Sequence, residues 1–331
     1  MSETQTKPTD SVAASSGLSF ERPLVEMQEK IAELEKLGEN THLDLAGEIA
    51  ALQKQLAKQT AAVYKKLTPW ETVKVARHCD RPLTADYIQL MLEDFTELHG
   101  DRLYRDDQAI VTGLATLRGR RFMLVGHRKG KTVKDRLACN FGCAHPEGYR
   151  KALGKMKLAE KLGVPIVSFI NTPGAYPGIG AEERGQASAI ATNILEMFKL
   201  KVPILVLVIG EGGSGGALGI GVGDRIAMLQ YSYYSVISPE GCAAIFWKSG
   251  EKAPEAAEAL KLTARDLRKN GLVDDVIEEL LGGAHRDNAA TVERVGDWIT
   301  KTIDELNERP IDELLAARYD KFRLMGQPPG V

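Results

Sequence analysis

The chain has 331 residues, a formal net charge of -2, 44% hydrophobic residues and 27% charged residues. These values exclude a disordered or collagen-like chain, because the apolar fraction is sufficient for a core and no Gly-X-Y period is present. The near-neutral charge gives no reason to expect nucleic acid or an anionic membrane as a partner. Any anion site must therefore be local.

The beginning of the chain and its cysteines indicate the compartment. Residues 1–19 are predicted to form a disordered tail, because MSETQTKPTDSVAASSG lacks the apolar core or the arginine content of a targeting segment. Four cysteines without a secretory signal are typical of reduced thiols. No apolar run approaches the roughly 18 residues of a membrane span. We therefore expect a cytoplasmic protein.

Residues 20–67 have the apolar spacing of a helical hairpin. Hydrophobic residues recur at steps of three and four from Leu24 to Leu34, and again from Leu45 to Val63. Gly38-Glu39-Asn40 is the predicted connection between the two helices. Such stripes usually pack against a neighbouring helix or subunit, so we expect a packing role for this segment.

From residue 68 to about residue 287 the pattern becomes that of an α/β domain. Of the 32 glycines, 20 lie between Gly113 and Gly223. The expected strands are Ala109 to Leu117, Arg121 to Gly126, Pro165 to Asn171, Pro203 to Ile209, Arg225 to Leu229 and Tyr233 to Ile237. Helical patterns between them predict parallel pairing. A helix is expected from Ala256 to Lys269, and residues 288–331 are predicted to be a C-terminal helical extension.

A glycine-dense turn follows the strand that begins at Pro203, and it matches two side-chain motifs. Gly210, Gly212 and Gly215 form G-x-G-x-x-G, but the next strand ends in Gln230-Tyr231, where a dinucleotide site needs an acidic residue. The same turn contains G-x-S-x-G around Ser214. Asp274 and His285 follow in hydrolase order, so a serine hydrolase is an alternative interpretation.

A third interpretation uses the backbone of this turn. Glycines expose N–H groups without a Cβ in the way, and the N-terminus of the following helix adds a positive potential. Such a turn can stabilise an oxygen that gains negative charge during a reaction. Close packing of the helix on the strand is the structural alternative, which suits Gly219, Gly221 and Gly223 best. For Gly215 and Gly216 we favour the oxyanion role.

A second glycine turn, Asn171 to Gly185, follows the strand that begins at Pro165. Two such turns on neighbouring strands can direct N–H groups at one point between them. Gly174, Ala175 and Tyr176 are the candidates on this side. Pro173 and Pro177 could alternatively serve only to shape a rigid loop.

Two weaker patterns remain. Cys139, Cys143 and His145 resemble half of a metal site, but no second close ligand pair is present, so we expect no zinc in this chain. The stretch His127 to Arg136 has five Lys or Arg residues, which face either an anionic ligand or solvent. No side chain stands out as a general base, which suggests that a substrate or carried cofactor supplies one.

Four segments together make the sequence resemble the carboxyltransferase alpha-subunit family of bacterial acetyl-CoA carboxylases. They are FGCAHPEGYRKAL (Phe141 to Leu153), TPGAYPGIGAEERGQ (Thr172 to Gln186), VIGEGGSGGALGIGVGD (Val208 to Asp224) and QYSYYSVISPEGCA (Gln230 to Ala243). The match extends from about Phe20 to about Asp287. The resemblance implies an α/β fold of the ClpP/crotonase type, a spiral of ββα units.

The resemblance also implies a reaction and its partners. The carboxyl group of carboxybiotin, held on the biotin carboxyl carrier protein, is transferred to acetyl-CoA, which gives malonyl-CoA for fatty-acid synthesis. A beta subunit supplies the zinc ribbon and most of the acetyl-CoA side in an α2β2 assembly. Biotin carboxylase belongs to the larger ATP-dependent complex.

On this basis we expect the chain to form the carboxybiotin side of a shared site. The expected catalytic residues are Gly215, Gly216, Gly174 and Ala175, whose amides stabilise the ureido oxygen. Gly212, Gly213 and Tyr176 are expected to line the cofactor site. Lys129 and Lys131 are expected to attract its anion or the phosphates of CoA.

Overall fold

The computed structural model describes residues 18–41 and 43–326, which fall into two compact units divided after Leu67. The expected tail, residues 1–19, lies almost entirely outside the described residues. No helix in the described ranges has the length and apolar character that a membrane span requires. Each unit is described separately below.

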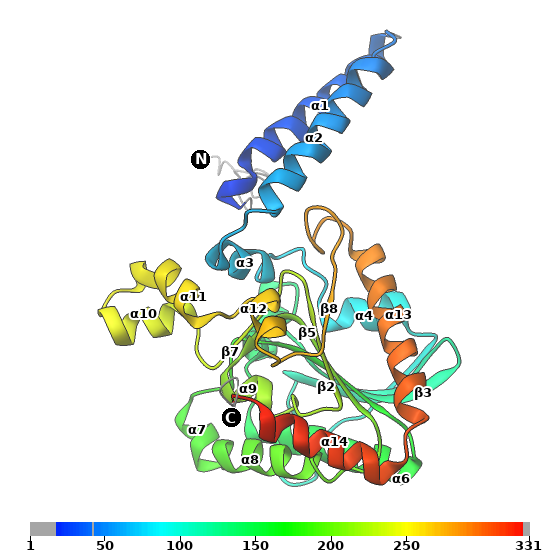
Figure 1. The fold of residues 1–331 in the computed structure, drawn as a ribbon, viewed down its shortest axis with the longest axis vertical. Coiled ribbons are helices and arrows are strands. Elements are labelled where there is room, and N and C mark those ends of the chain that lie inside the picture. Colours follow the sequence, from blue (N-terminus) through cyan, green and yellow to red (C-terminus); the bar gives the residue numbers. More distant parts are fainter. Residues whose placement is uncertain (1–17, 42, 327–331) are drawn as a thin grey trace, which may run out of the picture. The chain divides into compact units, whose positions relative to one another are not determined.

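The first unit is a helical hairpin (Figure 1). It contains the short 3-10 helix η1 (Ser19–Glu21), α1 (Arg22–Thr41) and α2 (Ala46–Tyr64). Tyr64 donates a hydrogen bond to the carboxylate of Glu21, and its ring lies edge-on to Phe20 with centroids 6.2 Å apart. These contacts join the start of α1 to the end of α2.

The connection between these helices differs from the predicted one. Gly38-Glu39-Asn40 lies inside α1, which continues to Thr41, where Oγ1 donates to the carbonyl of Leu37 over 2.6 Å. A single glycine costs a helix only about 1 kcal/mol, and Gly38 lacks the positive φ that ends helices. The next helix, α2, begins at Ala46, whose N–H donates to the carboxylate of Asp44 over 3.2 Å.

The second unit is built on one mixed sheet, ordered β1-β2-β3-β4-β5-β6-β8, with β7 paired to the end of β5. The strands are β1 (Asp94–Glu97), β2 (Ile110–Leu117), β3 (Arg120–His127), β4 (Ile166–Thr172), β5 (Ile204–Gly213), β6 (Arg225–Leu229), β7 (Tyr233–Ser235) and β8 (Asp275–Ile277). Pairing is antiparallel from β1 to β3 and parallel from β3 onward. The prediction of parallel pairing was therefore wrong for β2 and β3, because a tight turn at Arg118-Gly119 joins them as a hairpin.

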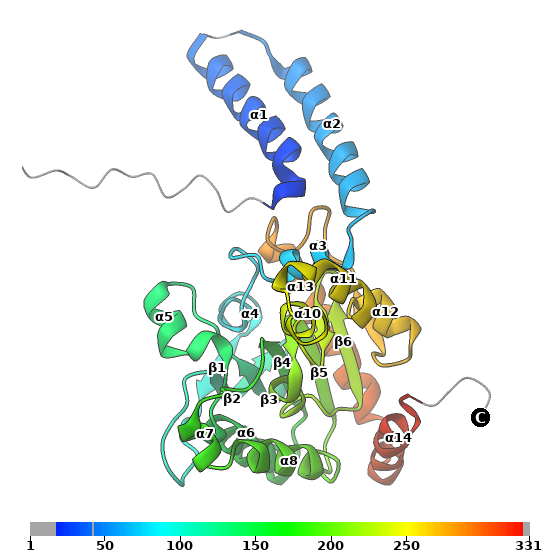
Figure 2. The ribbon, with the colours of Figure 1, turned by 90° about the vertical axis from the view of Figure 1, so that its left-hand side faces the viewer.

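Helices cover both faces of this sheet (Figures 1 and 2). The helices are α3 (Pro69–Ala76), α4 (Thr84–Met91), α5 (Val133–Ala138), α6 (Pro146–Leu162), α7 (Ile179–Glu183), α8 (Gln186–Met197), α9 (Ser214–Leu218), α10 (Pro239–Trp247), α11 (Ala253–Leu260), α12 (Ala264–Lys269), α13 (Asn288–Asn307) and α14 (Ile311–Leu324), with 3-10 turns η2 (Asn140–Gly142) and η3 (Gly250–Lys252). The expected helix from Ala256 to Lys269 is instead divided between α11 and α12. Lys261 has a left-handed backbone conformation that ends α11, and the side chain of Thr263 caps the start of α12.

Strand β5 forms the centre of both hydrophobic cores. Its alternate residues Ile204, Val206 and Val208 face the core beneath α6 and α8, whereas the residues between them face the core beneath α4 and α13. All ten of its residues are buried. Because β5 is enclosed on both faces, it holds the turn at its carboxyl end in a fixed position.

The C-terminal helices belong to the second unit. Residues along one side of α13, from Val292 to Leu306, lie in the core beneath that helix. Arg318 of α14 is 1% exposed and donates to Asp224 from Nε and Nη2, over 2.8 and 2.7 Å. It also donates to the carbonyls of Met197 and Leu200. This buried ion pair fixes α14 against the loops at the amino end of β5 and β6.

Candidate active site

The two glycine turns start at the same edge of the sheet. Strands β4 and β5 are parallel neighbours, and Thr172 at the end of β4 pairs with Gly212 near the end of β5. β5 continues into α9, whereas β4 continues into residues 173–178 and then α7. The carboxyl ends of adjacent parallel strands are a frequent position for ligand sites in α/β folds.

Because Gly213 and Gly216 have no side chain, the backbones of the two turns can touch. A Cβ on Gly213 would lie 2.1 Å from the carbonyl oxygen of Pro173, and one on Gly216 would lie 2.4 Å from the backbone nitrogen of Ala175. Neither distance is possible for real atoms. A Cβ on Gly215 would point instead toward Ile190 of α8, at 3.8 Å. Gly213 and Gly216 therefore set the separation of the turns.

The backbone N–H groups of the two turns differ in their partners. The first N–H groups of a helix have no acceptor within it, which applies to Gly215 and Gly216 in α9. On the second turn, Gly174 donates to Oγ1 of Thr172 over 3.1 Å, and Tyr176 donates to the carbonyl of Ala144 over 3.0 Å. Of residues 174–176, only Ala175 therefore has a backbone N–H without an acceptor among the described residues.

Buried polar side chains contact the backbone of the glycine turn that follows β5. Tyr149 donates to the carbonyl of Gly216 over 3.2 Å. The neighbouring His127 is 1% exposed, and burial lowers its pKa to about 3 although the carbonyls of Phe169 and Gly216 favour the proton. His127 is therefore neutral near pH 7. The sequence analysis noted it only as the start of the basic stretch.

A pocket of about 220 Å³ lies beside the turns and shares Pro173 with the second one. Glu211, two residues before Gly213, is 6% exposed and lines this pocket. Its carboxylate accepts hydrogen bonds from Lys129, from Arg77 Nε over 2.6 Å, and from the hydroxyl of Tyr233 over 2.9 Å. Burial opposes ionisation of Glu211, but Lys129 and Arg77 outweigh it and lower the pKa to about 2.

The other expected cofactor residues lie in different surroundings. Lys131 pairs with Asp86 at the start of α4 and is not among the residues that line the pocket beside Lys129. Tyr176 stacks on His145, with ring centroids 4.2 Å apart. This places His145, whose spacing from Cys139 and Cys143 resembled half of a metal site, against the second glycine turn. Gly212 packs against the ring of Tyr234.

Second-turn residues are also fixed by contacts that the sequence analysis missed. Thr172 Oγ1 donates to the carbonyl of Gly142 over 2.7 Å. Gln186, 4% exposed, donates to the carbonyls of Ala144 and Tyr176 over 2.8 and 2.9 Å. These bonds join the FGCAHPEG segment to the TPGAYPG segment. The only signal in the sequence was that both segments belonged to the resemblance.

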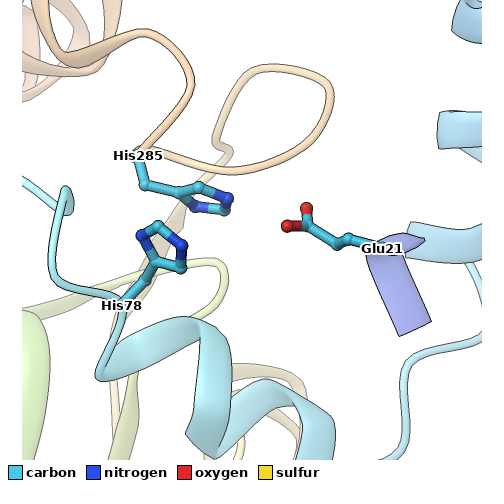
Figure 3. Close-up of side chains that lie close together, drawn as sticks. All are labelled: Glu21, His78 and His285. Atoms are coloured by element: carbon cyan, nitrogen blue, oxygen red, sulfur yellow. The ribbon is translucent and has the colours of Figure 1, made fainter. Parts of the chain in front are cut away.

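The side chains of the hydrolase alternative do not assemble. Ser214 has the positive φ of 57° expected for a nucleophile on a sharp turn. However, Asp274 precedes β8 and His285 follows it, so the two residues lie at opposite ends of that strand. Asp274 accepts the N–H of Ile226, and His285 stacks on His78 with centroids 4.1 Å apart (Figure 3). The serine-hydrolase prediction was therefore wrong.

Comparison with solved structures identifies the class of fold. The chain is similar to the beta subunit of P. aeruginosa geranyl-CoA carboxylase, with a TM-score of 0.53 and 18% identity over 74% of this chain and 46% of that one. It is similar to a Pseudomonas malonate decarboxylase hetero-tetramer in complex with coenzyme A, with a TM-score of 0.53 and 16% identity over 63% and 84%. The chain therefore has the α/β, crotonase-like fold that the resemblance implied.

Sequence comparison then identifies the family. The family model described as "Acetyl co-enzyme A carboxylase carboxyltransferase-like" matches residues 17–326. Proteins named acetyl-coenzyme A carboxylase carboxyl transferase subunit alpha are 53% identical in Rhodopirellula baltica, over 95% of this chain and 98% of that one, and 54% identical in Thiobacillus denitrificans, over 93% and 96%. This chain belongs to the acetyl-CoA carboxylase carboxyltransferase alpha-subunit family.

Proposed function

We propose that this chain supplies the carboxybiotin side of an acetyl-CoA carboxyltransferase, in which a carboxyl group passes from carboxybiotin to acetyl-CoA and malonyl-CoA is formed for fatty-acid synthesis. Family membership over residues 17–326 supports the activity. The observation that supports the site is the contact between the two glycine turns, with Gly216 directly against Ala175. This contact brings the backbone after β5 against the backbone after β4, which is what N–H donation from both turns to one oxygen requires.

The proposed role of the turns is electrostatic. When bound, carboxybiotin supplies the transferable carboxyl group, and its ureido oxygen gains negative charge as the group leaves. The N–H groups of Gly215, Gly216 and Ala175 donate to that oxygen, and Gly174 shapes the turn that presents Ala175. Fixed N–H donors stabilise such charge without having to reorient during the reaction.

Side chains around the turns serve a supporting role in this proposal. Gly212 and Gly213 allow close approach to the second turn and to β7, and Tyr176 forms a wall with His145. Lys129 keeps the adjacent pocket cationic, although Glu211 neutralises much of its charge. Lys131 lies with Asp86 and is proposed only as part of the long-range field that attracts anions.

We further propose that the chain works with a beta subunit in an α2β2 assembly, accepts carboxybiotin from the biotin carboxyl carrier protein, and functions in the cytoplasm with biotin carboxylase. In this proposal the beta subunit supplies zinc and the acetyl-CoA side. The four cysteines are all free, which suits a reducing compartment. Full-length chain assayed alone should transfer no carboxyl group, whereas a mixture with the beta subunit should do so. Full activity of the chain alone would contradict this division.

The site is tested by Gly216→Ala in the reconstituted complex. A Cβ at this position displaces Ala175, so we expect transcarboxylation kcat to fall by about 100-fold, as when an oxyanion donor is lost. Gly47→Ala on α2 is the matched control, because a Cβ there meets nothing within 4 Å. Malonyl-CoA formation and subunit assembly are measured for both variants. Equal activities in correctly assembled complexes would contradict the proposed site.

A further inference from the structure

A second polar cavity, separate from the glycine turns, lies between α6 and the loop that follows β1. It has a volume of about 370 Å³. Its lining consists of residues 98–102 from that loop together with Arg150, Gly154, Lys155, Lys157, Leu158 and Lys161 from α6. None of these residues takes part in the proposed carboxyl transfer. The cavity belongs entirely to the second unit.

Positive charge dominates this cavity. Its lining has five cationic side chains, Arg102, Arg150, Lys155, Lys157 and Lys161, against the single acid Asp101. Glu196, which is not part of the lining, lies with its carboxylate 2.7 Å from Lys157 Nζ and partly neutralises that charge. After Asp101, Glu196 and Glu147, which lies 3.6 Å from Arg150, are counted, an excess of two positive charges remains. Charges of one sign gathered around a cavity attract a counter-ion from solution.

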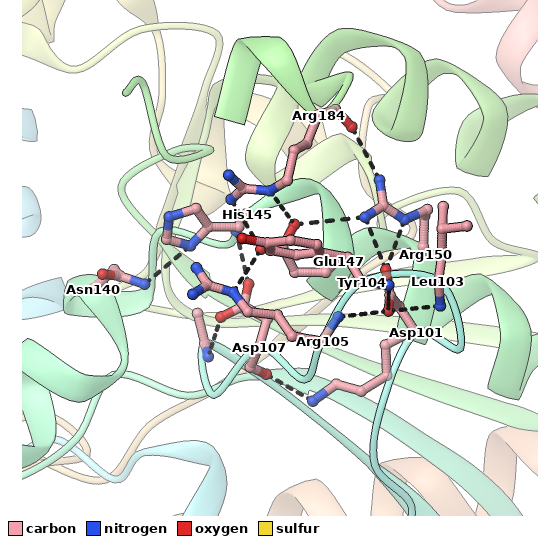
Figure 4. Close-up of polar contacts among 12 residues, drawn as sticks. Asp101, Leu103, Tyr104, Arg105, Asp107, Asn140, His145, Glu147, Arg150 and Arg184 are labelled. Carbon is pink, nitrogen blue, oxygen red and sulfur yellow. Dashed lines mark hydrogen bonds and ion pairs between the residues drawn. The ribbon is translucent and has the colours of Figure 1, made fainter. Parts of the chain in front are cut away.

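Asp101, the one acid in the lining, already accepts hydrogen bonds on both carboxylate oxygens. Asp101 Oδ1 accepts the backbone N–H groups of Leu103, Tyr104 and Arg105 over 2.8 to 3.0 Å, and Oδ2 accepts Arg150 Nε over 2.9 Å (Figure 4). Backbone bonds and Arg150 hold its pKa below the usual value despite the opposing effect of burial. Asp101 is therefore ionised, and both of its carboxylate oxygens already accept hydrogen bonds from these donors.

Lys155 is the most buried of these cations. It is only 8% exposed, and its Nζ donates to the carbonyls of His99 and Gly100 over 3.1 and 3.0 Å. The nearby carboxylates of Asp101 and Asp106 pair with Arg150 and Lys151 instead. Burial, followed by repulsion from Arg102 and Lys151, lowers the pKa of Lys155. A buried ammonium with neutral acceptors is costly, and a bound anion removes that cost.

We propose that this cavity binds a phosphate dianion, either free phosphate or the phosphate monoester group of a larger molecule. Two negative charges match the cationic excess better than one carboxylate does. Lys155 and Lys161 act as point charges, and Arg102 at the exposed rim offers a planar pair of donors. Gly154 leaves space in the cavity wall, since a Cβ there meets nothing within 4 Å.

Binding of inorganic phosphate to the full-length chain tests this proposal, measured by titration calorimetry at constant ionic strength. Gly154→Glu puts a carboxylate into the cavity without filling any packed space, and we expect it to weaken phosphate binding at least tenfold. Gly47→Glu makes the same change on α2, where a Cβ also meets nothing within 4 Å, and should leave the affinity unchanged. A second loss variant is Arg102→Gln with Lys161→Gln, which removes two positive charges at exposed positions.

Adenosine 3′,5′-bisphosphate, compared with inorganic phosphate, distinguishes the two sources of the dianion. Tighter binding of the bisphosphate supports a phosphate monoester on a larger molecule, and tighter binding of inorganic phosphate supports the free ion. If neither probe shows saturable binding up to about 10 mM, the proposal is overturned. Equal weakening by Gly154→Glu and Gly47→Glu overturns it as well. None of these outcomes depends on carboxyltransferase activity, so the proposed function can fail independently.

Discussion

Two neighbouring regions at the carboxyl end of β5 hold the structure together by different means. Glu211 gathers Lys129, Arg77 and Tyr233 around a side-chain carboxylate, whereas Gly213 and Gly216 bring two stretches of backbone together by having no side chain. The ion cluster depends on opposite charges and can relax around a substitution. The glycine contact depends on empty space and cannot relax without separating the turns. Substitutions that add volume should therefore have their largest effect in the glycine region. Substitutions that change charge should have theirs at Glu211.

The largest effect is expected from Gly213→Ala. The added Cβ would lie 2.1 Å from the carbonyl oxygen of Pro173, so the second turn must move. We expect overpacking to lower the free energy of unfolding by about 1–3 kcal/mol and transcarboxylation to fall by at least about 100-fold. Kinetics of the reconstituted complex and thermal unfolding measure the two quantities. Wild-type turnover in this variant would show that the separation of the turns is unimportant.

Glu211→Gln should mainly affect stability. The substitution keeps the shape of the side chain but leaves Arg77 and Lys129 without their shared partner. Removing one member of a buried ion pair costs about 3 kcal/mol, which urea unfolding would detect. In the double variant with Lys129→Met, part of this loss should be recovered, because one unpaired charge is gone. Additive losses in the double variant would mean that Glu211 and Lys129 do not interact.

The same carboxylate predicts a pH dependence of stability. Burial raises the pKa of Glu211, but Lys129 and Arg77 lower it to about 2, below the ordinary value of 4.5. The ionised form therefore stabilises the fold fully above pH 4.5, and this contribution is lost as the pH falls toward 2. The free energy of unfolding should fall less steeply over this range in Glu211→Gln than in the unmodified chain. Parallel pH profiles would rule out this role.

The smallest effect is expected from Ser214→Gly. Glycine tolerates the positive φ of 57° at this position, keeps the backbone N–H and removes only the hydroxyl. Transcarboxylation should stay within about threefold of the unmodified complex, a change of less than 1 kcal/mol in activation free energy. A collapse of turnover in an assembled complex would instead indicate that the hydroxyl is chemically required.

Local patterns in the sequence predicted much of the framework. The β6 strand was expected at its observed bounds, and both glycine turns were expected at the ends of the strands that precede them, because glycine clusters mark turns wherever they occur. Short elements were missed. Strands β1 and β8 have four and three residues and no clear alternation, so only their pairing with β2 and β6 defines them.

Contacts between distant segments could not be predicted. Arg77 and Glu211 are 134 residues apart, and nothing in either local sequence indicates their ion pair. Lys129 and Lys131 appeared equivalent in one basic stretch, but the fold directs the first to Glu211 and the second to Asp86. The roles of Gly174, Ala175, Gly215 and Gly216 remain predictions, although the fold explains why a substituent on Gly216 would push Ala175 away.

The proposed donors at the two turns are peptide groups, and this has a consequence for how the reaction responds to its surroundings. A peptide N–H neither gains nor loses a proton over the pH range in which proteins stay folded. An acid or alkaline limb in the rate profile therefore does not come from these donors and reports on other groups of the complex or on its substrates.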